Sequence, residues 1–176
     1  VPDFTAYLEL LKKYQQIGKN AAIVMNANPF TKGHRYLVAT AAKQNEHVYV
    51  FVLSEELSEF SSAERMSLVK QGVAHLANVT VLPTQQYLVS QATFPAYFLK
   101  DKAELSIAKT QAALDAHLFK ERIAPILGIK KRYVGEEPYS PVTEVYNQAM
   151  QQVFDGQLDL VIVPRKEVSG DIISAT

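Results

Sequence analysis

The chain has 176 residues, enough for one well-packed domain and too few for two full ones. Its 18 basic and 18 acidic residues balance, so overall charge gives no reason to expect binding to nucleic acid or to an anionic membrane. It contains no cysteine, no run of membrane-spanning length and no signal-peptide pattern, which excludes disulfides and thiolate chemistry and makes a cytoplasmic location our expectation.

The first segment reads as a helix. Apolar side chains have helical spacing over residues 3–17, Asp3 is a suitable N-cap, and Gly18 is a typical helix end. We expect residues 1–20 to be a helix and linker that follows an upstream domain.

After this helix, strands and helices alternate. Ser61 and Glu64 have the spacing of a capping box, and Pro125 and Gly128 are expected to stop the longest helix. In chain order we predict a strand at 21–25, a helix at 32–45, a strand at 47–54, a helix from Ser61 to Leu76, a strand at 79–83, a helix at 102–124, a strand at 132–135, a helix at 142–154 and a strand at 158–164. The alternation predicts an α/β, Rossmann-like three-layer sandwich with a mainly five-stranded parallel sheet and right-handed crossovers.

Ligands bind beyond the carboxyl ends of the strands in such sheets. The first strand is followed there by "NANPFTKGH" (26–34), a turn that leads into a helix. Thr31 can cap that helix and face an anion, Gly33 lets an anion approach the backbone, and His34 can donate a ring N–H to a phosphoryl oxygen. Taken alone, the turn is better explained by helix capping through Asn28 and Thr31, with His34 partly exposed at the surface.

The end of the chain has a second segment typical of a helix N-terminus that could bind an anion. In "ISAT" (173–176), Ser174 and Thr176 follow "SGD" and are typical of a second helix N-terminus suited to phosphate. An ordinary N-cap is again the alternative.

These motifs carry a resemblance. "TKGH" together with "ISAT" resembles the paired motifs of the HxGH-type nucleotidyltransferase superfamily. "NPFTKGHRYL", "SQATFPAYFLKD" and "RYVGEEPYSPVTEVYNQAM" resemble the C-terminal catalytic domain of citrate lyase ligase. The resemblance implies a nucleotidyltransferase-like catalytic domain over residues 21–176, whose C-terminus is truncated or disordered because the superfamily motif continues to a basic residue beyond Thr176.

The resemblance also implies an activity. Enzymes of this family use ATP and acetate to acetylate the prosthetic-group thiol on the acyl carrier subunit of citrate lyase, through acetyl-adenylate, and release AMP and pyrophosphate. Thr31 and His34 are then the catalytic residues. The implied ATP-binding residues are Asn28, Phe30, Gly33, Arg65, Gly135, Glu136, Ser174 and Thr176.

Several of these residues have a second interpretation. Glu136 either accepts hydrogen bonds from the ribose or is an exposed loop acid, and Arg65 either binds phosphate or acetate or forms a helix-surface salt bridge with Glu64 or a neighbour. Phe30 and "ATFPAYF" (92–98) either shape a pocket for the acetate methyl or belong to the core. The basic stretch 130–132 is either a solvated face or a docking site for an acidic carrier protein.

No protein-bound metal site is predicted, because His47, His75 and His117 lack ligand spacing. Mg²⁺ is expected with ATP, held by phosphates and water. Two other functions stay open: a nucleotidyltransferase that adenylylates a phosphorylated cofactor precursor, and a non-catalytic nucleotide-binding module. Oligomeric state and acyl specificity beyond the resemblance do not follow from the sequence.

Overall fold

The structure is a computed structural model of the chain, and it describes residues 2–54, 59–88, 102–137, 140–168 and 171–173. A single five-stranded parallel sheet has the strand order β3-β2-β1-β4-β5. Its strands are β1 (Asn20–Met25), β2 (His47–Val52), β3 (Val79–Pro83), β4 (Ile129–Gly135) and β5 (Asp159–Val163). The predicted fold class and all five predicted strands are therefore confirmed.

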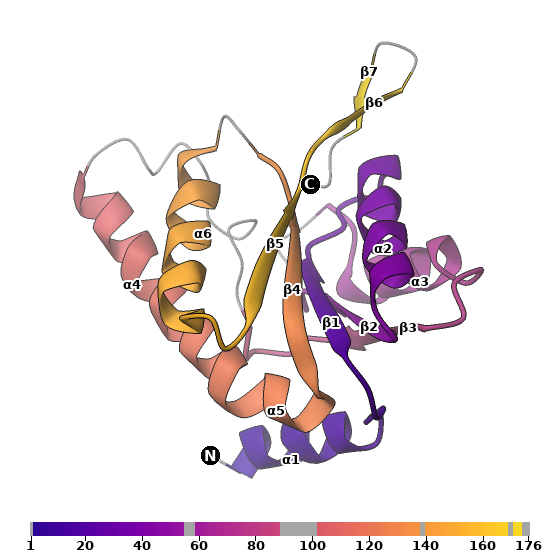
Figure 1. Cartoon of the computed structure of the whole chain (residues 1–176), viewed down its shortest axis with the longest axis horizontal. Helices are drawn as coiled ribbons and strands as arrows, with labels where there is room; N and C mark the ends of the chain where they lie inside the picture. Colours follow the sequence, from indigo (N-terminus) through magenta and orange to yellow (C-terminus); the bar gives the residue numbers. More distant parts are fainter. Residues whose placement is uncertain (1, 55–58, 89–101, 138–139, 169–170, 174–176) are drawn as a thin grey trace.

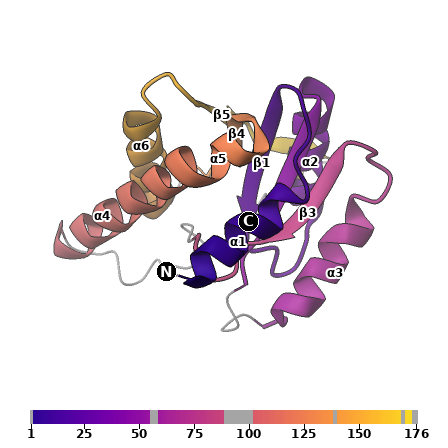
Figure 2. The same cartoon turned by 90° about the horizontal axis from the view of Figure 1, so that it is seen from below.

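Helices cover both faces of the sheet, which gives three layers (Figures 1 and 2). On one face lie α2 (Lys32–Gln44) and α3 (Ser62–Gly72); on the other lie α4 (Lys102–Leu118) and α6 (Pro141–Phe154). Strand β1 is buried on both faces: Ala21 and Ile23 belong to the core under α2 and α3, whereas Ala22 belongs to the core under α4 and α6. This alternation is the two-residue period of a strand, and it explains the continuous apolar run in the sequence.

The long helix runs further than predicted. A π-helical turn (Phe119–Ile123) follows α4, and α5 (Ala124–Leu127) continues past Pro125. The expectation that Pro125 ends the helix was wrong, because Pro125 lies in the first turn of α5, where a missing backbone N–H costs little. Gly128, with φ of 64°, ends the helix as predicted.

The first helix is shorter than predicted. Helix α1 spans Pro2–Lys12, so Asp3 lies inside it and Gly18 is not its cap. Beyond Lys12, tertiary hydrogen bonds hold the chain: the Tyr49 hydroxyl donates to the carbonyl oxygen of Tyr14 at 2.6 Å. Since Tyr7 and Leu11 are buried in the core, α1 packs as part of this fold, whatever precedes it.

The basic stretch 130–132 lies in β4, which begins at Ile129. Lys130 is exposed, but Arg132 is only 3% exposed, and its guanidinium carbon lies 4.9 Å from the centre of the Phe119 ring. The stretch is therefore not a uniformly solvated basic face, because Arg132 is buried against Phe119 in the core whereas Lys130 is exposed.

A two-stranded antiparallel hairpin that the sequence analysis did not predict follows β5. It consists of β6 (Lys166–Val168) and β7 (Asp171–Ile173). The predicted helix start falls on residues 174–176, and the predicted "ATFPAYF" pocket falls on residues 92–98; both lie outside the described residues.

Candidate functional site at the carboxyl end of the sheet

The candidate site lies where β1, β2, β4 and β5 end, on the edge of the sheet opposite α1 (Figure 1). Hydrogen bonds at this edge join the loop after β1 to the segment after β2, and the loop after β4 to β5. The backbone N–H of Phe60, in the segment after β2, donates to Oδ1 of Asn28, in the loop after β1, at 3.1 Å. The backbone N–H of Glu136 after β4 donates to the carbonyl oxygen of Val163 in β5 at 2.9 Å.

Thr31 and His34 form a reciprocal capping box at the start of α2. The His34 backbone N–H donates to Oγ1 of Thr31 at 3.3 Å, and the Thr31 backbone N–H donates to Nδ1 of His34 at 2.9 Å. Histidine here takes the place of the usual glutamate or glutamine at the third helical position. The capping role considered for this turn is confirmed, and it fixes the imidazole at the helix N-terminus, where the helix dipole favours an anion.

The capping box also sets the tautomer of His34. Because the backbone N–H of Thr31 can only donate, Nδ1 must accept, and the proton of the neutral ring is on Nε2. Among the described residues, Nε2 has no hydrogen-bond partner. The side chain is 1% exposed, and burial lowers the pKa of His34 from 6.5 to about 4. His34 is thus not a surface residue, and near neutral pH it is a neutral imidazole with one N–H to donate.

This lowered pKa makes stability depend on pH. The fold favours the neutral ring, so between about pH 4 and the ordinary pKa of 6.5 the unfolded chain binds the extra proton. Stability due to His34 is therefore complete above that range and is lost as the pH falls through it. Lowering the pH from about 7 to about 5 should cost about 2 kcal/mol through this residue.

Denaturant unfolding of the wild type and of His34→Gln at both pH values measures this contribution. The pH-dependent loss should be smaller in the variant by about 2 kcal/mol, because all other titrating groups are common to both proteins. Equal losses in the two proteins would show that His34 is protonated as readily in the fold as in the unfolded chain.

The rest of the turn surrounds His34. The ring of Phe30 stacks on the imidazole, with centroids 5.6 Å apart and planes 18° from parallel, and Gly33 is buried. Asn28 is half-buried and holds the turn to Phe60. The structure therefore brings Asn28, Phe30, Thr31, Gly33 and His34 together in one turn. Their roles toward a ligand stay predictions.

Arg65 has a setting that neither sequence interpretation anticipated. The side chain is 0% exposed, and it donates to the carbonyl oxygens of Leu53, Asn26 and Phe60 at 2.7, 3.0 and 3.1 Å. The predicted surface salt bridge with Glu64 is wrong, because the Glu64 carboxylate instead accepts from Ser61 in the capping box of α3. A contact of Arg65 with phosphate or acetate stays a prediction, beside the observed role of holding two loops together.

Gly135 ends β4, beside β1 in the sheet, and Glu136 follows it. Glu136 is half-buried, and its Oε1 accepts from the backbone N–H of Arg165 at 3.2 Å. Arg165 also forms an ion pair with Glu137, at 2.7 Å, which sequence reasoning missed. The predicted ribose contact of Glu136 is untested. Ser174 and Thr176 lie outside the described residues.

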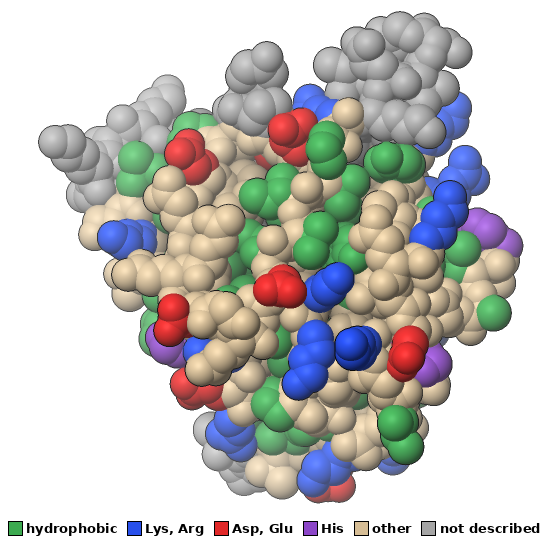
Figure 3. Space-filling view, in the orientation of Figure 1, with side chains coloured by type: hydrophobic (Ala, Val, Ile, Leu, Met, Phe, Trp, Pro, Cys, Tyr) green, Lys and Arg blue, Asp and Glu red, His purple; other side chains and the backbone are tan. Residues whose placement is uncertain are grey.

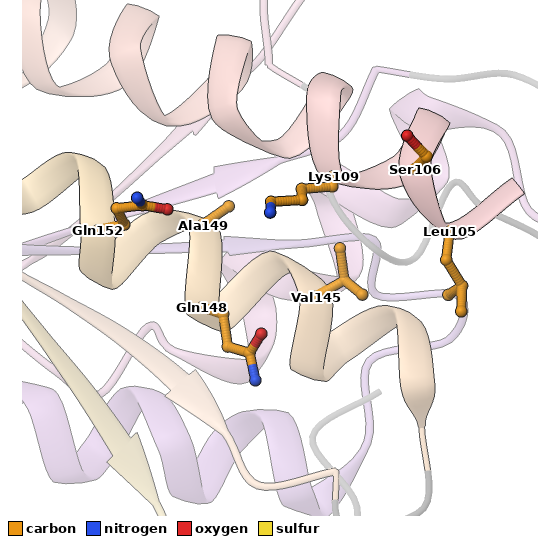
Figure 4. Close-up of a pocket in the computed structure, with 7 residues that line it drawn as sticks. All are labelled: Leu105, Ser106, Lys109, Val145, Gln148, Ala149 and Gln152. Atoms are coloured by element: carbon orange, nitrogen blue, oxygen red, sulfur yellow. The ribbon is translucent and has the colours of Figure 1, made fainter. Parts of the chain in front are cut away.

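Two clefts lie away from His34. One, of about 360 Å³, is bounded by the loop after β4, by α6 and by β5, and it includes Glu136, Glu137 and Glu144 in its lining. The other is a groove of about 270 Å³ between α4 and α6, over which Lys109 reaches toward α6 (Figure 4). On the face drawn in Figure 3, acidic and basic side chains are interspersed, in keeping with the balanced charge.

Within the described ranges, no three His, Asp or Glu residues form a group that could hold a metal ion. None of the helices described there has the length and apolarity of a membrane-spanning segment.

Residues 20–176 match the family model described as the citrate lyase ligase C-terminal domain. The [citrate [pro-3S]-lyase] ligase of Klebsiella pneumoniae is 42% identical over 178 residues, which cover 98% of this chain and 52% of that protein. The chain spans about half the length of the curated relatives it matches.

Two solved structures share the fold. The pantoate-beta-alanine ligase of Francisella tularensis, in complex with beta-gamma ATP and beta-alanine, has a TM-score of 0.56 at 15% identity, over 96% of this chain and 69% of that one. The bifunctional NMN adenylyltransferase/ADP ribose pyrophosphatase of the same organism has a TM-score of 0.50 at 14% identity, over 87% of this chain and 40% of that one. At such identities the likeness concerns the fold, which is of the nucleotidyltransferase type.

Proposed function

This chain belongs to the citrate lyase ligase family, and on that premise we propose that it is the catalytic domain of an ATP-dependent ligase acting on citrate lyase. The enzyme activates acetate as acetyl-adenylate and acetylates the prosthetic-group thiol of the acyl carrier subunit. The observation that carries the proposal is His34: a neutral imidazole, fixed by Thr31 at a helix N-terminus, with Nε2–H available as a donor.

The reaction has two steps. A carboxylate oxygen of acetate attacks the α-phosphorus of ATP, the bond from that phosphorus to the bridging oxygen breaks, and pyrophosphate leaves. The thiolate sulfur then attacks the acetyl carbon, the bond to the phosphate oxygen breaks, and AMP leaves, while the thiol proton passes to solvent. Charge increases on phosphate oxygens in the first step, so the chain contributes mainly by positioning and by donors aimed at those oxygens.

Each residue of the turn then has a role. Nε2–H of His34 and the hydroxyl of Thr31 stabilise the α- and β-phosphate oxygens, and the N-terminal N–H groups of α2 add donors. Gly33 leaves room for a phosphate beside the backbone. We propose that Asn28 and Phe30 shape the turn, and that Ser174 and Thr176 bind the β- and γ-phosphates.

Mg²⁺ enters this scheme as part of the ATP complex. Phosphate oxygens and water are the ligands that suit it. The chain's own part is to hold the phosphates, through the groups named above.

The test is acetate-dependent exchange of labelled pyrophosphate into ATP, measured on the longer protein and on this chain. Exchange that requires acetate supports the proposal. Adenylylation of a phosphorylated cofactor precursor without acetate would instead indicate another nucleotidyltransferase, and ATP binding without exchange would indicate a non-catalytic module.

The role of Glu136 is tested separately. If its carboxylate accepts a hydrogen bond from a ribose hydroxyl, Glu136→Gln should raise the KM for ATP about tenfold, because a hydrogen bond to a charged group is lost. The wild type should discriminate against 2′- or 3′-deoxy-ATP, and the variant should lose that discrimination. Glu121→Gln is the matched control, because Glu121 is an exposed carboxylate that does not line the cleft beside Glu136. Equal discrimination in Glu136→Gln and in the wild type would remove Glu136 from the ribose site.

A further inference from the structure

Gly72, in the last turn of α3, lies in direct contact with the ring of Phe30. A Cβ atom added at Gly72 would lie 2.3 Å from Cε2, 2.7 Å from Cδ2 and 3.4 Å from Cζ of that ring. Carbon atoms in ordinary contact lie about 3.5–4.0 Å apart, so any side chain at this position would force the ring to retreat by about 1 Å or more. The edge of the Phe30 ring therefore occupies the space that a Cβ would need.

The backbone of Gly72 does not itself require glycine. Glycine near a helix end usually adopts a left-handed conformation, but Gly72 is not among the positive-φ residues, and the cap of α3 is Val73, with φ of −113°. Inside a helix, glycine is less favourable than alanine. The close approach of Phe30 is thus the feature of the structure that accounts for glycine at position 72.

The other side of this contact is His34. Phe30 stacks on the imidazole with 5.6 Å between the ring centroids. The imidazole is also held by the hydrogen bond that the Thr31 backbone N–H donates to Nδ1. Thr31 fixes the position of Nδ1 of His34, whereas Phe30 fixes the orientation of the imidazole plane about Nδ1. Gly72, Phe30 and His34 therefore form a continuous stack from α3 to the N-terminus of α2.

We propose that Gly72 is a positioning residue for His34: its missing side chain lets Phe30 lie against α3, and Phe30 sets the direction of the imidazole donor. This inference rests on the proposed function for its effect on catalysis. It also assigns Phe30 to the support of His34 rather than to a pocket for the acetate methyl. A displacement of about 1 Å at a reacting group can cost about a hundredfold in rate, so a single methyl group at position 72 is large enough to matter.

The experiment compares Gly72→Ala, Phe30→Leu, their double variant and Gln71→Ala. Gln71 is the matched control, because it is an exposed neighbour in the same helical turn. Two-dimensional NMR of the histidine ring protons gives a readout that needs no activity, with His34 assigned from His34→Gln. Acetate-dependent pyrophosphate exchange gives kcat and KM for each variant.

In Gly72→Ala we expect shifted His34 ring resonances and a kcat lowered roughly tenfold to a hundredfold, with a smaller change in the KM for ATP. Phe30→Leu should remove the ring-current shift of His34 and also lower kcat, and it tests the stack without crowding α3. In the Phe30→Leu background, Gly72→Ala should have little further effect, since the ring with which it clashes is gone. Gln71→Ala should behave like the wild type.

Unchanged His34 resonances in Gly72→Ala, or equal losses of kcat from Gly72→Ala with and without Phe30, would overturn the inference. If the resonances shift as expected but the wild type shows no acetate-dependent exchange, the positioning stands and the proposed function fails. If Gly72→Ala does not fold while the double variant does, the clash is supported, and Phe30→Leu alone decides the effect on His34.

Discussion

Replacing His34 by alanine is expected to lower acetate-dependent pyrophosphate exchange by about a hundredfold or more, because one donor to a developing charge is typically worth about 3 kcal/mol. The structure attributes this loss of activity to one ring nitrogen. Since Nδ1 is occupied by Thr31, only Nε2–H can donate a hydrogen bond to a ligand. Because the imidazole is already neutral and held before ATP binds, little reorganisation is needed during the reaction. The effect should appear in kcat more than in the KM for ATP.

His34→Gln separates catalysis from helix capping. Glutamine at the third helical position can still accept from the backbone N–H of Thr31, as in the usual capping box, but it has no ring donor at the place of Nε2. We expect His34→Gln to unfold at nearly the wild-type temperature at neutral pH and to lose nearly as much exchange as His34→Ala. Near-normal kcat in a folded His34→Gln protein would mean that His34 is a helix cap and not a catalytic residue.

Replacing Arg65 by methionine is expected to have the largest effect on stability. Methionine has comparable length but no donors, and the carbonyl oxygens of Asn26, Leu53 and Phe60 would lose the guanidinium that they share. Buried acceptors left without a donor cost about 1–3 kcal/mol each, so a total of roughly 3–5 kcal/mol is expected. For a chain of this length, that lowers the Tm by roughly 10 °C.

Two controls accompany this variant. Lys70→Met removes an exposed cation from the same helix and should change stability by no more than about 0.5 kcal/mol. Arg65→Lys keeps the charge but replaces the planar fork by a single ammonium, so it should recover only part of the stability. A normal Tm in Arg65→Met, combined with a strongly raised KM for ATP or acetate, would favour the predicted ligand contact over the role in holding the loops.

The sequence determined the elements whose signals are local. Strand β3 spans Val79–Pro83 as predicted, and the capping box of Ser61 and Glu64 opens α3 as predicted. The turn from Asn26 to His34 is recognisable from the sequence as one unit at the end of a strand, because capping residues, glycine and an apolar run lie within a few residues of one another. Signals of this kind depend on φ and ψ preferences and on contacts three or four residues apart, which a single sequence shows directly.

Only the tertiary structure decided which side chains meet across the fold. Arg65 is separated from Asn26 by 39 residues, and whether its guanidinium faces solvent, a ligand or those carbonyl oxygens depends on how α3 docks on the sheet. The contact between Gly72 and Phe30 depends on the same docking, and so does the burial that lowers the pKa of His34. Desolvation and close packing arise only when segments far apart in the chain exclude water together, so no local pattern can reveal them.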